Sequence, residues 1–344
     1  MKIVIDNSIP FIEGVFEPYA EVVYLDGASI SRDDLTEADA LVARSRTKCN
    51  EELLEGTPVK IISTVNIGTD NIDMQYCNQK GIYVQNASGC NSGGVMNYVF
   101  SALYGVAARK CISLEDTTIG IVGVGHAGSK IQNAARLLGF KTLLYDPPRE
   151  AEEGHSQFCD LDFLLRNSDI VTLHLPLNPS TRGMADASFF SKMKLGAMFI
   201  NVSRGELVVD DALINAAPKL GSIIIDTWNN EPDINLKLME IADIATPHIA
   251  GYSYQGKQIG TSMAVKAIAR YFGIKPLFDF YPASDYEAHD AVKLELSGKK
   301  QGEIASAIQY NYPIFTDDFM LRIAPDSFAE LRRNYRYRRE FIIL

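Results

Sequence analysis

The stretch Gly123-Val-Gly-His-Ala-Gly128 constrains the fold of this 344-residue chain more than any other feature. It overlaps the end of an apolar run, Thr118–Val124, and leads into a segment whose apolar residues recur with helical spacing as far as Leu138. A second run, Lys141–Tyr145, follows and is succeeded by Asp146. A strand, a glycine-rich turn, a helix, a strand and an acid in this order predict a dinucleotide-binding unit.

Each part of this unit has a predicted role. Gly123 permits the tight turn, Gly125 lets the backbone approach a pyrophosphate, and Gly128 lets the helix pack closely on the strand. The pyrophosphate would then cap the N-terminus of the helix. Asp146 would accept hydrogen bonds from the adenosine ribose hydroxyls and repel a 2′-phosphate, which favours NAD as the cofactor. The alternative is a glycine-rich turn in some other α/β protein.

Composition excludes several classes of function. The formal net charge of −10 argues against non-specific binding to nucleic acid or to an anionic membrane, because both require a basic surface. The five cysteines are scattered and form no C-x-x-C pair, so we expect neither a metal site nor a disulfide framework. The chain begins with a strand-like run rather than a signal peptide, and no apolar run is long enough to span a membrane. We therefore expect a cytoplasmic protein.

Short β-rich runs alternate with amphipathic stretches along most of the chain. Before residue 91 the runs are 2–5, 21–24, 40–43, 60–65 and 82–85, and the helical stretches are 31–37, 50–55 and 73–80. After a long helix that starts near Asn91, further runs lie at 170–174, 197–201, 222–226 and 243–246. This alternation predicts an α/β protein with two doubly wound parallel sheets. A helix through Met263 would return the chain to the first domain, and the tail predicts a strand at 292–296 and a helix at 327–335.

Several polar residues fall where predicted strands end, at the edge where doubly wound sheets bind ligands. Arg204 lies in Asn201-Val-Ser-Arg-Gly205, Glu231 in Asp226-Thr-Trp-Asn-Asn-Glu-Pro232, and His248 in Thr246-Pro-His-Ile-Ala-Gly-Tyr252. Together with the segment Gly68–Asp73 and the glycine loop, these motifs resemble, in order and spacing, those of the D-isomer-specific 2-hydroxyacid dehydrogenases. Taken singly, each residue has a structural explanation: a surface ion pair, a solvated acid or a structural histidine.

The resemblance implies a domain organisation. Residues 1–92 and 257–284 would form a flavodoxin-like substrate-binding domain, and residues 93–256 a Rossmann NAD-binding domain. Residues 285–344 would form a small C-terminal α+β dimerisation segment. The stretches Val42–Lys48, Ser88–Asn91 and Phe328–Glu340 resemble the members of the family that act on a phosphorylated 2-hydroxyacid and form homodimers.

The resemblance also implies a mechanism. His248 would take the C2-hydroxyl proton while hydride leaves to the nicotinamide, because imidazole can carry a proton in both directions near neutral pH. Glu231 would bond the other ring nitrogen, and Arg204 would bind the substrate carboxylate through its planar fork. The implied cofactor-binding residues are Gly123, Gly125, His126, Ala127, Gly128, Asp146, Leu175, Val202, Ser203, Arg204, Asp226 and Gly251.

A phosphorylated substrate requires a second anion site. Arg44, Ser45 and Arg46 are the best candidates, because arginine forks and a hydroxyl suit a phosphate, although an exposed basic turn would look the same. Asn66 and Tyr252 complete the implied substrate-binding set. The tail arginines could add positive charge or could form a solvated helix face; they are Arg332, Arg333, Arg336, Arg338 and Arg339.

Two other functions remain open at this stage. The substrate could be 3-phosphoglycerate or an unphosphorylated 2-hydroxyacid. The chain could also be a non-catalytic NAD sensor that binds protein partners, although a sensor need not keep all of Arg204, Glu231 and His248. We expect a small-molecule substrate and a homodimer, with no nucleic acid or membrane partner.

Overall fold

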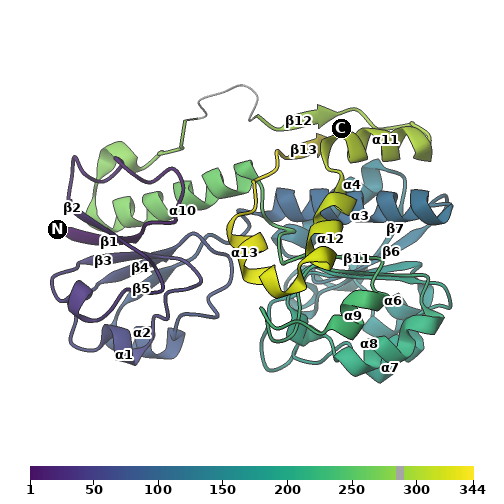
Figure 1. The fold of residues 1–344 in the computed structure, drawn as a ribbon, viewed down its shortest axis with the longest axis horizontal. Helices are drawn as coiled ribbons and strands as arrows, with labels where there is room; N and C mark the ends of the chain where they lie inside the picture. Colours follow the sequence, from purple (N-terminus) through teal and green to yellow (C-terminus); the bar gives the residue numbers. More distant parts are fainter. Residues whose placement is uncertain (284–289) are drawn as a thin grey trace. The chain divides into compact units, whose positions relative to one another are not determined.

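The computed structural model describes residues 1–283 and 290–344 (Figure 1). The predicted boundary between residues 284 and 285 lies outside the described residues. Contacts divide the chain into two compact units. Unit 1 comprises Met1–Asn91 and Tyr254–Asp290, and unit 2 comprises Ser92–Ser253 and Ala291–Leu344. Within the described residues, no helix is long and apolar enough to cross a membrane.

Unit 1 is built on a five-stranded parallel sheet with the strand order β2-β1-β3-β4-β5. Its strands are β1 (Lys2–Asp6), β2 (Glu21–Leu25), β3 (Ala40–Ala43), β4 (Ile61–Thr64) and β5 (Tyr83–Gln85). This is the flavodoxin-like order, as predicted. All four residues of β3 are buried, as expected for a central parallel strand that is covered on both faces.

Helices cover both faces of this sheet. They are α1 (Glu51–Leu54), α2 (Met74–Lys80) and α10 (Tyr254–Phe272), with 3-10 turns η1 (Asp33–Leu35) and η5 (Lys275–Leu277). One face packs on α10 and the other on α1 and α2. The helix predicted over residues 31–37 is wrong, because only the turn η1 forms there. The Asp34 carboxylate accepts hydrogen bonds from the Ser31 amide and hydroxyl, which closes a single turn before β3 begins.

Unit 2 contains a six-stranded parallel sheet with the order β11-β10-β9-β8-β6-β7. Its strands are β6 (Thr118–Val122), β7 (Lys141–Tyr145), β8 (Ile170–Leu173), β9 (Met198–Asn201), β10 (Ser222–Ile225) and β11 (Ile244–Ala245). The strand order reverses between β6 and β8. A doubly wound sheet binds its ligand at such a reversal, at the carboxyl ends of the strands.

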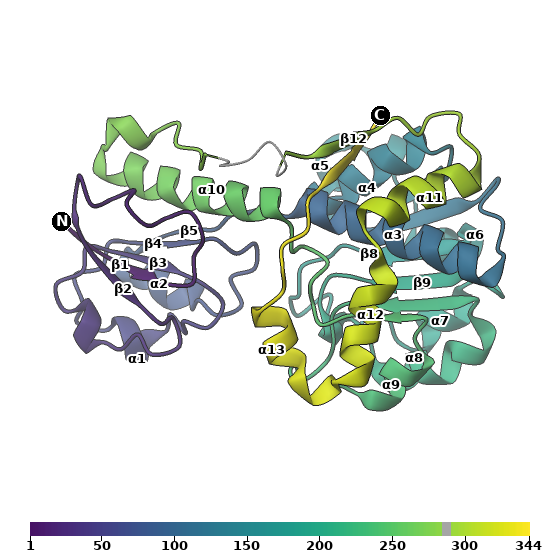
Figure 2. The same ribbon diagram turned by 45° about the horizontal axis from the view of Figure 1, so that its top comes forward.

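The helices of unit 2 lie on both faces of its sheet (Figure 2). They are α3 (Ser92–Lys110), α4 (His126–Leu137), α5 (Pro147–Glu153), α6 (Leu161–Asn167), α7 (Ala187–Lys192), α8 (Asp210–Ala216) and α9 (Leu236–Ile241), with 3-10 turns η2 (His155–Gln157), η3 (Gly205–Leu207) and η4 (Ala217–Lys219). One core contains residues of α3 and α4, and the other contains residues of α6, α7 and α8. The sheet is therefore covered on both sides, as predicted.

The C-terminal segment packs on unit 2. It contains β12 (Val292–Leu294), α11 (Gln301–Asn311), α12 (Ile314–Ile323), η7 (Pro325–Ser327), α13 (Phe328–Arg333) and β13 (Phe341–Ile343). The strands β12 and β13 form a small parallel sheet. Helices α11 and α12 contact α3, which is buried from Ser92 to Ala107. The sequence did not predict α11 and α12, although it did predict β12 and α13.

Helix α12 also covers the edge of the six-stranded sheet. Asp318 Oδ1 accepts a 2.7 Å hydrogen bond from the Ala245 amide of β11, an edge strand of this sheet. The Asp318 carboxylate is itself held by the Nε of Arg322, with both distances 2.9 Å. The Arg322 guanidinium continues to the carbonyl oxygens of Met239 and Ala242, at the end of α9. Covering an edge strand with a helix in this way hinders its pairing with another chain.

Candidate active site and cofactor site

The glycine loop lies at the reversal of the strand order in unit 2. Gly123 has a φ of +89°, and a Cβ there would lie 2.5 Å from the His174 carbonyl oxygen, just after β8. A Cβ on Gly128 would lie 2.1 Å from the Gly123 carbonyl oxygen, so only glycine allows α4 to pack this closely. At Gly125, by contrast, a Cβ would have nothing within 4 Å among the described residues. The loop is therefore closed where it meets the protein and open where a pyrophosphate would approach.

Asp146 follows β7 and is fixed against this loop. Its Oδ2 accepts a 2.7 Å hydrogen bond from the Val124 amide, and its Oδ1 accepts a 3.1 Å bond from the Arg149 amide. Arg149 Nη1 in turn donates to the Val124 carbonyl at 2.6 Å. A carboxylate has about four lone-pair sites, so Asp146 can still accept hydrogen bonds from ribose hydroxyls. Sequence reasoning assigned no role to Arg149, which holds the loop and the acid together.

The structure brings His248 and Glu231 together. His248 Nδ1 lies 2.8 Å from Glu231 Oε2 and 3.0 Å from Oε1, so the imidazole donates directly to the carboxylate. The Trp228 amide donates to Glu231 Oε1 at 3.0 Å, which holds the acid in place. With Nδ1 engaged, Nε2 is the ring nitrogen left to exchange a proton with a substrate. This is the arrangement that the sequence predicts for a proton carrier.

Glu231 is held in its ionised form. Burial would raise the pKa of Glu231, but the charge and hydrogen bond of His248 and the charge of Arg332 outweigh it, so that the pKa is lowered. Arg332 Nη1 on α13 lies 3.6 Å from Glu231 Oε2, and the Arg332 guanidinium lies 5.9 Å from the Tyr252 ring centroid. The sequence left Arg332 either as added positive charge or as part of a solvated helix face, and the structure places its guanidinium beside Glu231, the carboxylate that binds His248.

Arg204 lies in the loop after β9, immediately before η3, and its Nη1 donates to the Ser203 carbonyl at 2.9 Å. The next residue explains how this loop reaches the Glu231 loop. A Cβ on Gly205 would lie 1.9 Å from the Trp228 carbonyl carbon, so the two backbones are in direct contact. Arg204, Glu231 and His248 thus follow the neighbouring strands β9, β10 and β11, at one edge of the sheet.

Asp226 holds the loop that carries His248. Its fully buried carboxylate accepts hydrogen bonds from the Ile249 and Ala250 amides, both 2.8 Å, and from the Thr246 hydroxyl at 2.7 Å. The Thr246 hydroxyl also lies 2.6 Å from the Tyr98 hydroxyl. His248 itself has a φ of +56°, a left-handed conformation that the surrounding contacts maintain. The contact of Asp226 with the cofactor stays a prediction. The sequence did not predict that Asp226 also holds the His248 loop.

The remaining cofactor candidates lie at the same edge of the sheet. His126 and Ala127 begin α4, and the Leu175 side chain would be 3.0 Å from a Cβ on Gly123. The Ser203 hydroxyl donates to the Leu173 carbonyl at 2.7 Å. Val202 is buried, and Gly251 follows the His248 loop, 3.3 Å from where a Cβ on Gly94 would lie. Their contacts with NAD stay predictions.

Four of the substrate candidates belong to unit 1. Arg44 Nη1 donates to the Ser8 carbonyl at 2.9 Å and to the Ser8 hydroxyl at 3.0 Å. Arg46 forms an ion pair with Asp26, and Ser45 is exposed. The Asn66 Nδ2 is buried with no hydrogen-bond partner among the described residues, and its contact with the substrate stays a prediction.

The fifth substrate candidate, Tyr252, belongs to unit 2. Its ring packs edge-to-face on Tyr335 and Tyr337 of the C-terminal segment.

Comparison with known proteins identifies the class. Residues 104–250 match the family described as D-isomer specific 2-hydroxyacid dehydrogenase, NAD binding domain. The matched residues include the glycine loop, Asp146 and the whole Arg204, Glu231 and His248 set. The chain belongs to the D-isomer-specific 2-hydroxyacid dehydrogenase family, and it is an NAD-dependent oxidoreductase that acts on a hydroxyacid.

Two proteins with similar sequences carry the name of one particular enzyme. A protein of Bacteroides fragilis named erythronate-4-phosphate dehydrogenase is 40% identical over 99% of this chain and 97% of its own length. A protein of the same name from Salmonella paratyphi B is 39% identical over 99% of this chain and 92% of its own length. The similarity therefore includes the C-terminal segment, beyond the matched NAD-binding domain.

Solved structures share the fold. The NAD⁺-bound 3-phosphoglycerate dehydrogenase of Entamoeba histolytica is 26% identical with a TM-score of 0.68, over 81% of this chain and 97% of that one. The D-lactate dehydrogenase of Aquifex aeolicus, complexed with NAD and lactic acid, is 25% identical with a TM-score of 0.64. That match covers 83% of this chain and 100% of the other.

Proposed function

We propose that this chain oxidises 4-phospho-D-erythronate at C2 to (3R)-3-hydroxy-2-oxo-4-phosphooxybutanoate, with NAD as the acceptor, as a step in vitamin B6 biosynthesis. The observation that carries the proposal is the direct hydrogen bond between His248 and Glu231 at the sheet edge that also bears Arg204. The name shared by relatives about 40% identical over nearly the whole chain supports the choice of substrate.

The side chains divide the work of the reaction. Bound NAD supplies the hydride acceptor. His248 Nε2 accepts the proton of the C2 hydroxyl as the C2 hydride leaves, so that a ketone and an imidazolium form together. Glu231, which stays ionised, stabilises the imidazolium through its contact with Nδ1. Arg204 binds the substrate carboxylate and stabilises charge on the C2 oxygen.

A substrate panel tests the proposal. Purified protein is incubated with NAD and, in turn, with 4-phospho-D-erythronate, 3-phosphoglycerate, D-lactate and D-glycerate, and NADH formation is followed by absorbance. We expect the highest kcat/KM for 4-phospho-D-erythronate. A higher value for 3-phosphoglycerate or for an unphosphorylated acid would replace the proposed substrate but leave the dehydrogenase class intact.

Arg44 and Arg46 of unit 1 are the proposed phosphate ligands. The Arg46 ion pair with Asp26 is exposed, and such pairs are weak, so a phosphate can displace it. Changing either arginine to alanine should raise KM for 4-phospho-D-erythronate by about 10-fold, since a hydrogen bond to a charged group is worth about 1.5–3 kcal/mol. Turnover of D-glycerate, which lacks the phosphate, should change little.

A control variant separates phosphate recognition from loss of surface charge. Lys60→Ala removes one exposed cation of the same unit, paired with Asp39 at 2.7 Å, and should leave KM unchanged for both substrates. Equal losses with both substrates in the Arg44 and Arg46 variants would count against a phosphate site at this turn.

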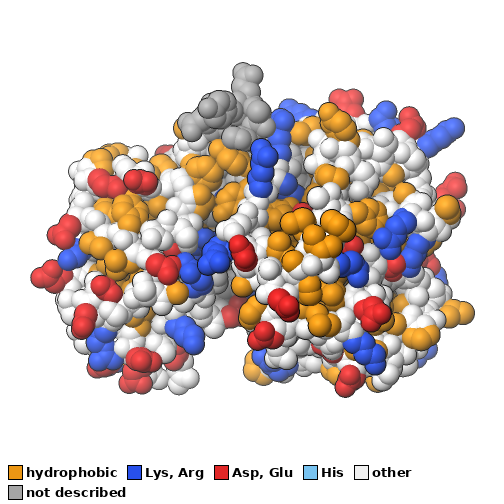
Figure 3. Space-filling model, in the orientation of Figure 1, with side chains coloured by type: hydrophobic (Ala, Val, Ile, Leu, Met, Phe, Trp, Pro, Cys, Tyr) orange, Lys and Arg blue, Asp and Glu red, His pale blue; other side chains and the backbone are white. Residues whose placement is uncertain are grey.

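We also propose that the chain acts as a cytoplasmic homodimer. Helix α12 exposes Phe319, Met320 and Ile323, with exposed fractions of 59%, 43% and 58%. Figure 3 shows hydrophobic side chains gathered over the C-terminal helices on this face of the molecule. Apolar side chains concentrated on one exposed face are typical of a protein interface, and this supports a dimer contact through the C-terminal segment.

A further inference from the structure

Arg338 lies in the C-terminal segment between α13 and β13, yet it is bonded to the loop that carries His248. Its guanidinium is buried, with 9% of the residue exposed. Nη1 donates to the Ile249 carbonyl at 2.9 Å, and Nη2 donates to the Gly94 carbonyl at 3.0 Å and to the Ala250 carbonyl. Two of its three backbone acceptors thus belong to the residues that directly follow His248.

The opposite side of the same loop is held by Asp226. The amides of Ile249 and Ala250 donate to its carboxylate, while their carbonyls accept from Arg338. The buried Asp226 carboxylate and the buried Arg338 guanidinium therefore bind the amides and the carbonyls, respectively, of Ile249 and Ala250. His248 is the next residue along the chain, and its own amide donates to the Asp226 carbonyl at 2.8 Å. The conformation of the His248 loop depends on this two-sided contact.

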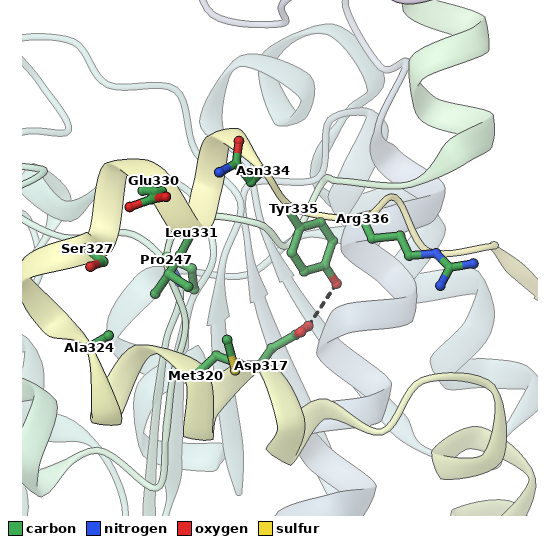
Figure 4. A pocket seen from close by; sticks show the side chains of 10 residues that line it. All are labelled: Pro247, Asp317, Met320, Ala324, Ser327, Glu330, Leu331, Asn334, Tyr335 and Arg336. Atoms are coloured by element: carbon green, nitrogen blue, oxygen red, sulfur yellow. Dashed lines mark hydrogen bonds between the residues drawn. The ribbon is translucent and has the colours of Figure 1, made fainter.

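The environment of Arg338 is itself well defined. The guanidinium stacks on the Tyr312 ring, 4.3 Å from its centroid, and Nη1 lies 3.4 Å from the Tyr335 hydroxyl. Tyr312 and Tyr335 both donate to Asp317 Oδ2 at 2.8 Å. Figure 4 shows Tyr335 pointing toward Asp317 in a cavity of about 460 Å³ that Pro247 also lines. These contacts leave Arg338 little freedom to move.

We propose that Arg338 is a positioning residue for the reaction proposed above, on which this inference rests. Its planar fork can bind several carbonyls at once in a fixed geometry, which an ammonium group cannot do. A general base must be held within a fraction of an ångström of its working position to act efficiently. Arg338 does this through the loop, without touching the reacting atoms. Of the two roles that the sequence left open for Arg338, the solvated helix face is wrong, because the residue is buried and its donors bind backbone carbonyls.

The C-terminal segment also contacts Glu231, the carboxylate that binds His248. Arg332, six residues before Arg338, lies 3.6 Å from Glu231. Arg332 therefore contacts Glu231 directly, and Arg338 binds the two residues that follow His248. Both arginines lie outside residues 104–250, the part that matches the family's NAD-binding domain. The C-terminal segment thus completes the active site of unit 2 in addition to any role in dimerisation.

The test compares Arg338→Met and Arg338→Lys with Lys293→Met, which removes an exposed cation from β12 of the same segment. We expect Arg338→Met to lower kcat by about 10-fold, because small misplacement of a catalytic group slows the chemical step. Arg338→Lys should recover part of the loss. The affinity for NADH should be unchanged, and the primary isotope effect on kcat with substrate deuterated at C2 should increase. Lys293→Met should resemble the unmodified protein.

An unchanged kcat in a folded Arg338→Met protein would overturn the proposal. A fall in kcat that is fully explained by a smaller fraction of folded protein would overturn it as well. If Arg338→Met does not fold, the Arg338→Lys variant decides between the same outcomes. A second readout needs no turnover: the proton NMR signal of His248 Nδ1–H, assigned by its absence in His248→Gln, should broaden or shift in the Arg338 variants. A wild-type protein inactive on every acid would refute the proposed function, while this NMR signal would still test the positioning role.

Discussion

We expect His248→Gln to lower kcat for 2-hydroxyacid oxidation by about 1,000-fold, the middle of the range for general acid–base catalysis. The amide of glutamine can fill the space of the ring and can donate to Glu231, but it cannot accept a proton from the substrate hydroxyl. The glycine loop and Asp146 are unaffected by the change, so the affinity for NADH should remain that of the unmodified protein. Stopped-flow measurement of NADH formation gives the rate, and fluorescence titration gives the affinity.

His155→Gln is the matched control. His155 also contacts an acid, Glu150, with Nδ1 to Oε1 at 2.6 Å, but it lies on η2 and is exposed. Its replacement should leave kcat unchanged. If the two histidine variants had similar rates, His248 could not be the base, and the catalytic reading of the His248–Glu231 contact would fail.

Gly125→Val should weaken NADH binding by about 100-fold, because it removes about 3 kcal/mol of hydrogen bonding to a charged pyrophosphate. The backbone of Gly125 is extended, with a φ of −70° and a ψ of −153°, so it does not use the left-handed region that favours glycine. No described atom lies within 4 Å of the added Cβ, so the branch point of the new side chain meets open space. The free energy of unfolding should therefore stay the same while the affinity falls.

Variants of two other glycines serve as controls for Gly125→Val. Gly302→Ala makes a similar change in open space on α11 and should alter neither NADH affinity nor catalysis. Gly128→Ala should lower both the affinity and the unfolding midpoint, because its Cβ would lie 2.1 Å from the Gly123 carbonyl oxygen. Undiminished NADH affinity in Gly125→Val would mean that the pyrophosphate does not bind at this loop. Titration with NADH and thermal unfolding measure the two properties.

The parts of the fold that the sequence predicts are those set by local pattern. Strands such as β3 and β8 are short apolar runs buried on both faces, and their carboxyl ends identify the edge that bears the site. The spacing of Gly123, Gly125 and Gly128 predicts a turn whose geometry the structure bears out. The contact between His248 and Glu231 also agrees with expectation, although the residues lie 17 positions apart.

The parts that the sequence does not predict depend on distant contacts. Helix α11 has no clear apolar stripe of its own, and it is tied to α3 through Gln309, whose Nε2 donates to the Ser101 carbonyl at 2.7 Å. Arg338 meets Ala250 across 88 positions, so no local pattern could distinguish it from the exposed arginines beside it. A tail residue that contacts a catalytic loop can be found only once the fold is known.

Transfer of deuterium from C2 of the substrate to the cofactor tests the central claim most directly. The protein is incubated with NAD and with 4-phospho-D-erythronate deuterated at C2, and the reduced cofactor is analysed by mass spectrometry. We predict NADH that carries the deuterium, formed far more slowly by His248→Gln. Tight binding of NADH with no deuterium transfer from this acid, from 3-phosphoglycerate or from D-lactate would contradict the account and favour a non-catalytic NAD sensor.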